Sequence, residues 1–279
     1  MKISMIMPVY NEAILLPMHL RLASPHLDEI ILIDGSPFGP STDETRQIAS
    51  QFRNVTVTKG TYTQPGEAGA WDKRAQISTG VAMAAGDIII ITSVDTVYSD
   101  YGMLAETIRS SSPEEKVWYC PSIEFFIDTS HIRLVIQEGG FPLPQIVYII
   151  VARDVFSEQE TAYFKSAQVD PREMVYLHDM VKYHYGWITD FDVQVRKHVR
   201  NVKAGWWGEY GESLLKGGEK ALEVWAITHI LNYTKEIVFP YASLNPHPLK
   251  SLEFNRLNNF DRVLEQFQEK YGVDYYNCL

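Results

Sequence analysis

The chain has little cysteine and no long apolar segment. Only Cys120 and Cys278 occur among the 279 residues, and neither belongs to a Cys-x-x-Cys pair. This usage argues against a disulfide framework or a zinc knuckle, and the expected location is the reducing cytoplasm. No apolar run approaches the roughly 20 residues of a membrane-spanning helix. Pro8 interrupts the opening segment, so we expect no cleaved signal peptide.

The chain also lacks an excess of positive charge. It carries 25 Lys and Arg against 35 Asp and Glu, a formal net charge of −10. This balance argues against broad nonspecific binding to nucleic acid or to an anionic membrane, although it leaves room for a local basic groove. The apolar fraction of 46% is that of an ordinary globular protein, and we find no internal repeat or low-complexity tract.

The first hundred residues alternate between short apolar runs and amphipathic segments. Repeated strand–helix–strand units predict a parallel sheet covered by helices on both faces. Pro17 either sits in the first turn of the first helix or kinks it, and Ser41 or Thr42 opens the second helix. The predicted strands are 2–7, 29–33, 54–58 and 87–92, and the predicted helices are 12–23, 42–52 and 68–85.

The alternation ends after the fourth strand. Strands without intervening helices follow, which predicts a mixed or antiparallel extension of the sheet. The last third of the chain is helical and shows no clear linker, so we predict one α/β domain with a helical C-terminal extension. The later strands are predicted at 116–127, 130–137 and 145–152, and the helices near 170–184, 189–201, 212–232 and 256–271.

Chemically useful side chains follow the first two predicted strands. Pro8 is expected to end the first strand, and Tyr10 and Glu12 lie in the loop after it. Asp34 ends the second strand, where a carboxylate can accept hydrogen bonds from a base or from ribose hydroxyls. The carboxyl ends of parallel strands meet at one edge of a sheet, so these residues are expected to face one cleft.

A possible phosphate clamp and a metal ligand follow. Lys73 and Arg74 lie in the third helix, and a guanidinium suits bidentate contacts to phosphate. The buried run after Gly86 ends in Ser93-Val94-Asp95. A carboxylate at this edge can ligate a divalent cation, which in turn can hold a diphosphate.

These motifs occur in an order that resembles the family 2 glycosyltransferases of GT-A fold. The motifs are Met-Pro-Val-Tyr-Asn-Glu, Asp-Glu-Ile-Ile-Leu-Ile-Asp-Gly-Ser, Lys-Arg-Ala-Gln and Ser-Val-Asp, within residues 2–100. The resemblance implies a nucleotide-sugar donor. It implies that Pro8, Tyr10, Glu12 and Asp34 hold the base and that Lys73, Arg74 and Ser93 also bind the donor. Asp95 would ligate Mn²⁺ or Mg²⁺.

The sequence departs from the family pattern at two points. Ser93 replaces the first carboxylate of the family's Asp-x-Asp signature, so only Asp95 remains for the metal, while Ser93 can still bond a ribose hydroxyl. Residues 35–40 replace the usual compact turn after the second strand. Anchoring the comparison on the strand makes Asp34 the base-binding carboxylate, whereas anchoring on Gly35-Ser36 shifts the position by one.

A second motif near residue 190 suggests the catalytic base. Gly-Trp-Ile-Thr-Asp-Phe-Asp is similar to the family's Glu-Asp-x-Asp motif, which implies Asp190 as the base and Trp187 as an apolar wall beside the acceptor. The alternative is a capping box in which Thr189 caps the helix and Asp192 lies three residues on. His247 fits a third metal ligand by its order in the chain, or it is a surface loop histidine.

We therefore predict a metal-dependent, inverting glycosyltransferase with a UDP-linked donor. Residues 1–110 would form the nucleotide-sugar-binding half, and 111–279 the acceptor-binding half with its helical extension. The acceptor class is open among saccharide, lipid, protein, small molecule and modified nucleic-acid base. One alternative is a degenerate nucleotide-sugar-binding module. The other is a sugar-phosphate nucleotidylyltransferase, whose Gly-rich N-terminal signature is absent between Met5 and Glu12.

Overall fold

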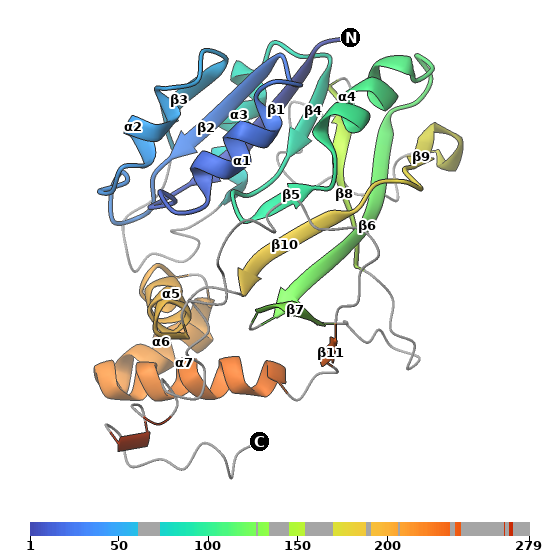
Figure 1. The fold of residues 1–279 in the computed structure, drawn as a ribbon. Coiled ribbons are helices and arrows are strands. Elements are labelled where there is room, and N and C mark those ends of the chain that lie inside the picture. The colour runs from blue at the N-terminus through green and yellow to red at the C-terminus, as the bar shows by residue number, and fades with distance from the viewer. Residues whose placement is uncertain are drawn as a thin grey trace. The chain divides into compact units, whose positions relative to one another are not determined.

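A computed structural model of the chain divides into two compact units, drawn in Figure 1. Unit 1 comprises Met1–Thr63, Asp72–Ser122 and Ile146–Lys182, and unit 2 comprises Gln64–Trp71, Ile123–Gln145 and Tyr183–Leu279. Within the described ranges, no helix combines the length and the apolar character that crossing a membrane requires. The structure describes residues 1–60, 73–126, 128–133, 145–153, 170–187, 191–205, 207–234, 238–240, 265 and 268–269.

Unit 1 is built on a four-stranded parallel sheet in the order β4-β1-β2-β3. Strand β8 lies antiparallel to β4, and β9 pairs in parallel with β6. This mixed, mostly parallel arrangement confirms the predicted α/β class. The strands of this unit are β1 (Ile3–Val9), β2 (Glu29–Asp34), β3 (Val55–Lys59), β4 (Ile88–Ile91), β5 (Thr96–Tyr98), β6 (Val117–Phe126), β8 (Gln145–Ala152) and β9 (Met174–Tyr176).

Apolar strands and helix faces form the core of unit 1. Helix α1 (Leu16–Ala23) holds Pro17 in its first turn, one of the two predicted placements, and buries Leu16, His19, Leu20 and Ala23. Helix α3 (Lys73–Met83) packs against β1 and β2. Successive side chains of a strand point to opposite faces, so Ile6 and Ile33 face α3, whereas Asp34 points to the other face.

Gly80 lets α3 lie unusually close to the sheet. A Cβ atom at this position would lie 2.4 Å from Cγ2 of Ile6 and 2.9 Å from Cδ1 of Ile33. Both distances are shorter than real Cβ contacts, and the neighbours are the branched ends of core side chains. The absent side chain is therefore a packing requirement of this helix–sheet contact.

Pro8 does not end the first strand, contrary to the prediction. Strand β1 continues in parallel register, with Pro8 opposite Ile33 and Val9 opposite Asp34. The even-numbered residues of β1 hydrogen-bond toward β4, as the Thr92 N–H donating to Ile6 O shows. Strand β4 ends at Ile91, opposite Ile6. The missing N–H of Pro8 therefore faces a side without a ladder partner and costs no strand hydrogen bond.

Two features of unit 1 differ from the predicted helices. The second helix, α2, covers only Thr45–Ala49. Ser41 donates to Asp34 instead of capping a helix, and the bond at the helix start comes from Asp43, whose Oδ1 accepts the Thr45 N–H at 3.0 Å. A helix was missed at α4 (Tyr101–Ser110). Asp100 marks its start, since its carboxylate accepts the N–H of Met103 as an N-cap.

Unit 2 combines a small antiparallel sheet with packed helices. Strand β7 (Asp128–Arg133) pairs with the end of β6 and with β11 (Val238–Pro240). Helices α5 (Phe191–Lys203), α6 (Gly208–Lys216) and α7 (Gly218–Thr234) share a core with Val195, Val202, Ala226 and Ile227 at its centre. The predicted helix 189–201 is thus confirmed as α5, with its start and end shifted by two residues.

Two further helix predictions were wrong. The segment predicted as helix 170–184 forms a short 3-10 turn (Pro171–Glu173), strand β9 and the start of strand β10 (Lys182–Trp187). Aromatic and β-branched residues favour strands here. The predicted helix 212–232 is split into α6 and α7, because Gly218 adopts a left-handed φ of 78°. Most of the predicted helix 256–271 lies outside the described residues.

Candidate functional site

The Ser93-Val94-Asp95 segment forms a tight turn directly after β4. The Thr96 N–H donates to Ser93 O at 3.1 Å, which closes the turn. The Ser93 hydroxyl donates to Asp95 Oδ1 at 2.5 Å and lies 2.9 Å from the Thr96 hydroxyl. Val94 is buried, whereas Ser93 and Asp95 are partly exposed. The structure thus brings the two predicted residues together and fixes the Asp95 carboxylate at the sheet edge.

A buried histidine supports this turn from inside the core. His19 Nδ1 lies 2.9 Å from the Val94 carbonyl oxygen, and His19 Nε2 lies 2.6 Å from the Tyr101 hydroxyl. Burial lowers the pKa of His19 to about 4, against the opposing effects of the Val94 hydrogen bond and of nearby Asp95. The ring is therefore neutral near pH 7. His19 was not among the sequence candidates, because a histidine on an apolar helix face has no distinguishing pattern.

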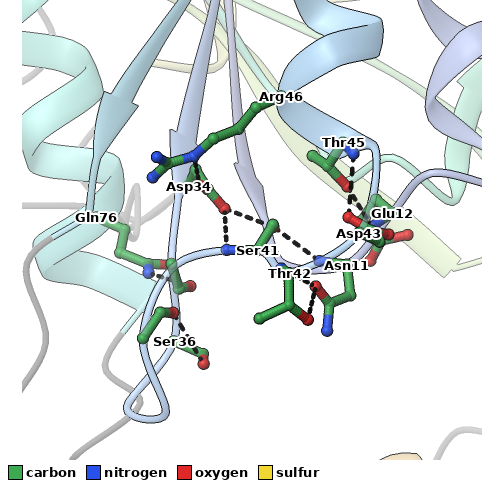
Figure 2. Close-up of polar contacts among 12 residues, drawn as sticks. Asn11, Glu12, Asp34, Ser36, Ser41, Thr42, Asp43, Thr45, Arg46 and Gln76 are labelled. Atoms are coloured by element: carbon green, nitrogen blue, oxygen red, sulfur yellow. Dashed lines mark hydrogen bonds and ion pairs between the residues drawn. The ribbon is translucent and has the colours of Figure 1, made fainter.

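Asp34 lies at the end of β2 with its side chain fully buried and its carboxylate engaged inside the protein (Figure 2). Oδ1 accepts the Ser41 N–H at 3.0 Å and the Ser41 hydroxyl at 2.5 Å. Oδ2 accepts from Nε of Arg46, whose side chain is half exposed. Both carboxylate oxygens hold the loop after β2 in place. Direct reading of a base by Asp34 therefore stays a prediction.

The same loop is joined to the segment after β1 by hydrogen bonds, several of them drawn in Figure 2. The Asn11 N–H donates to the Ser41 hydroxyl at 2.9 Å, and the Thr42 N–H donates to Asn11 Oδ1 at 2.8 Å. The Glu12 N–H donates to the Thr45 hydroxyl at 2.8 Å. Residues 11–13 and 41–45 thus form one hydrogen-bonded unit, which we call the loop pair. It carries Glu12 and adjoins Tyr10 and Pro8.

Helix α3 begins at the two predicted phosphate-binding residues. Lys73 and Arg74 form its first positions, which confirms that a helix carries them, although their side chains lie outside the described set. Gln76 is buried in the next turn and donates from Nε2 to Gly35 O at 3.0 Å, so it ties α3 to the loop after β2. Its Oε1 is buried and has no hydrogen-bond partner among the described residues.

The predicted catalytic residues belong to unit 2. Asp190 directly precedes α5 but lies outside the described residues, as does His247, and of Trp187 only the backbone in β10 is described. Helix α5 is tied to β10, because Gln194 Nε2 donates to Gly186 O at 2.6 Å. The helix is therefore anchored to the strand end that leads into the predicted base. Thr189 also lies outside the described residues, so the capping-box alternative stays open.

A protein-family comparison identifies the chain. The model of glycosyl transferase family 2 matches residues 4–144. The chain belongs to this family. It is therefore a glycosyltransferase, and the family membership decides against the nucleotidylyltransferase alternative. No curated protein sequence matches the chain.

Several solved structures are similar to the chain at low sequence identity. TarS from S. aureus (residues 1–349) is 15% identical, with coverage of 84% of this chain and 71% of that one and a TM-score of 0.42. The mannosyltransferase PcManGT from Pyrobaculum calidifontis, in complex with GDP-Man and Mn²⁺, is 15% identical over 84% and 74%, with a TM-score of 0.41. Glucosyl-3-phosphoglycerate synthase from Mycobacterium tuberculosis, in complex with UDP, is 17% identical over 55% and 57%, with a TM-score of 0.37. The family assignment rests on the family match alone.

Proposed function

We propose that this glycosyltransferase moves a sugar from a UDP-linked donor to an acceptor hydroxyl, with inversion at the anomeric carbon and with a divalent cation. The observation that carries the proposal is the Ser93–Thr96 turn, which holds the Asp95 carboxylate at the carboxyl end of β4. In open α/β sheets, ligands bind at this edge. The family membership supplies the reaction class.

The residues of the turn fit Mn²⁺ or Mg²⁺. Both cations prefer oxygen ligands, and Asp95 offers a carboxylate between the hydroxyls of Ser93 and Thr96. Among the described residues no group of three His, Cys, Asp or Glu side chains could hold a metal alone. This agrees with a cation held by one carboxylate and completed by substrate phosphates. When bound, the cation would stabilise the charge on the leaving diphosphate. His247 remains the proposed further ligand.

The donor would lie across the carboxyl edge of unit 1. Lys73 and Arg74 are proposed to contact its phosphates at the start of α3, and Ser93 a ribose hydroxyl. The loop pair places the backbone around Tyr10 and Glu12 beside the end of β2, which supports the proposal that Pro8, Tyr10, Glu12 and Asp34 surround the base. The internal bonds of Asp34 favour an indirect part, in which it shapes the loop that meets the base.

Asp190 is the proposed general base, and Trp187 the proposed apolar wall beside the acceptor. Inverting transfer needs a carboxylate that takes the acceptor proton as the new glycosidic bond forms. The position of Asp190 immediately before α5 supports the assignment, because the family's catalytic motif also opens a helix. Inversion follows from this single-displacement scheme, in which one carboxylate acts and no glycosyl-enzyme bond forms. We keep the cytoplasm as the proposed location.

The test measures donor binding and sugar release together. Thermal shift with UDP, GDP and other nucleotides, each with and without Mn²⁺, should single out UDP with Mn²⁺. UDP release from a matching UDP-sugar should then require Mn²⁺ and disappear in Asp95→Ala. Glu106→Ala is the matched control, since it removes an exposed carboxylate of α4 outside the proposed donor site. Full activity in excess chelator would refute the metal requirement.

A further inference from the structure

The strongest unexplained arrangement in unit 1 is the buried pair formed by His19 and Tyr101. His19 is fully buried and Tyr101 is 3% exposed. Each lies on a different helix, His19 in α1 and Tyr101 at the first position of α4. Their contact of 2.6 Å and the 2.9 Å contact from His19 to Val94 form a chain that ends at the turn after β4.

The hydrogen bonds fix the state of the imidazole. A carbonyl oxygen only accepts, so Nδ1 must carry the proton that is donated to Val94 O. In the neutral ring Nε2 is then an acceptor, and the Tyr101 hydroxyl must donate to it. Both ring nitrogens and the hydroxyl are thereby satisfied in a site without water access. Each partner determines the orientation of the other.

The carbonyl that His19 holds is the one that determines where Asp95 points. The Val94 C=O and the Asp95 N–H belong to one planar peptide group. Holding the carbonyl oxygen from the core side therefore fixes the plane from which the Asp95 Cα–Cβ bond projects. The hydroxyls of Ser93 and Thr96 restrain the carboxylate from its own end. Asp95 is thus fixed through its backbone and through its side chain.

We infer that His19, oriented by Tyr101, is a positioning residue that sets the Asp95 carboxylate for divalent-cation and diphosphate binding. This inference rests on the proposed function of Asp95. Ser93 replaces a second carboxylate, so one charged ligand remains in the turn. A single carboxylate binds well only if its orientation is fixed in advance, because no second charged ligand corrects a misplaced first one. The buried pair supplies that orientation from the core.

The test separates the two hydrogen bonds of His19. In His19→Asn the side-chain amide replaces the Nδ1 donor to Val94, whereas His19→Leu removes both bonds. Loss of a group that orients a metal ligand typically lowers metal affinity about 10–100-fold. Mn²⁺ affinity in the presence of UDP, measured from the EPR signal of free Mn²⁺, should fall by about tenfold or more in His19→Leu. It should recover most of this loss in His19→Asn. Tyr101→Phe should lie between wild type and His19→Leu.

A control variant and an independent measurement make the outcome specific. Ile108→Ala shortens a buried side chain of α4 away from the turn and should leave Mn²⁺ affinity unchanged in the folded protein. Nitrogen-15 NMR of the wild-type imidazole should show the Nδ1–H tautomer. That measurement remains available if His19→Leu does not fold.

The negative results distinguish a failure of the proposed function from a failure of this inference alone. Wild-type Mn²⁺ affinity in Asp95→Ala would overturn the proposed function and this inference with it. Lost affinity in Asp95→Ala with wild-type affinity in folded His19→Leu would overturn the inference alone. An Nε2–H tautomer in the wild type would do the same, because it places no proton toward Val94.

Discussion

Replacing Asp34 separates an anchor of the loop from a direct ligand of the base. Asp34→Ala removes the acceptor of three hydrogen bonds, two from Ser41 and one from Arg46. Asp34→Asn keeps an amide oxygen for Ser41 but loses the charge that pairs with Arg46. The two variants therefore remove different fractions of the same interaction.

The structure sets the size of each effect. Hydrogen bonds to a charged group contribute roughly 1.5–3 kcal/mol each. The contribution of Arg46 is smaller, below about 1 kcal/mol, because its side chain is 50% exposed. The two Ser41 bonds share the oxygen Oδ1, so we take the lower end of the range for them. We therefore expect Asp34→Ala to lower the free energy of unfolding by about 3 kcal/mol, and Asp34→Asn by about 1 kcal/mol. Both losses lie below the stability of a typical domain, about 5–15 kcal/mol, so both variants should fold.

The assay combines urea unfolding, hydrogen exchange and nucleotide titration. If Asp34 is an anchor, Asp34→Ala should accelerate amide exchange in residues 11–13 and 41–45, because the loop pair loses its connection to β2. UDP affinity should fall together with this loosening, by roughly tenfold. Ser41→Ala is the companion variant and should reproduce part of both changes. Lost UDP affinity in Asp34→Ala with unchanged stability and exchange would refute the anchor and identify a direct base ligand.

Three other substitutions test two proposed site residues and the lowered pKa of a buried histidine in α5. Arg74→Ala should weaken UDP binding by at least about tenfold without unfolding the chain, as calorimetry would show; unchanged affinity would remove Arg74 from the donor site. Asp190→Asn should slow transfer about 10²–10⁴-fold with donor affinity nearly unchanged, and a wild-type transfer rate would return Asp190 to helix capping. For His198, burial, aided by His229 and Lys197, lowers the pKa from 6.5 to about 4. The unfolded chain therefore takes up a proton below pH 6.5 that the folded chain resists. Titration of His198 should therefore lower the free energy of unfolding by about 3 kcal/mol between pH 6.5 and 4. An equally steep fall in His198→Phe would show that His198 is not the cause.

The four strands of the parallel sheet in unit 1 could be predicted because their signals are local. A continuous β-branched run such as residues 88–91 favours a buried strand over a helix. Once the strand is predicted, the residues at its end can be identified from the sequence. The loop after β2 could not be predicted in the same way. Ser41 and Thr42 have the residue types of a helix cap, and only the tertiary structure brings Asn11 and Asp34 close enough to hydrogen-bond with them.

The second half of the chain was predicted less well for a related reason. The segment 170–184 contains mixed apolar and polar residues whose periodicity is ambiguous between a helix and short strands. Pairing of β9 with β6 decides the outcome, and no local pattern reports that pairing. The sequence does mark the break between α6 and α7, because the pair Gly217-Gly218 favours a turn within the apolar periodicity around it.

Gly80 links the packing of the core to the position of the proposed phosphate-binding residues. The helix rises 1.5 Å per residue, so Gly80 lies about 10 Å along the axis from Lys73, where α3 begins. A helix is stiff over so short a distance. A side chain at Gly80 would push α3 away from Ile6 and would displace the helix start by a similar amount. A mutation in the core would thereby shift Lys73 and Arg74, the two residues proposed to hold the donor phosphates.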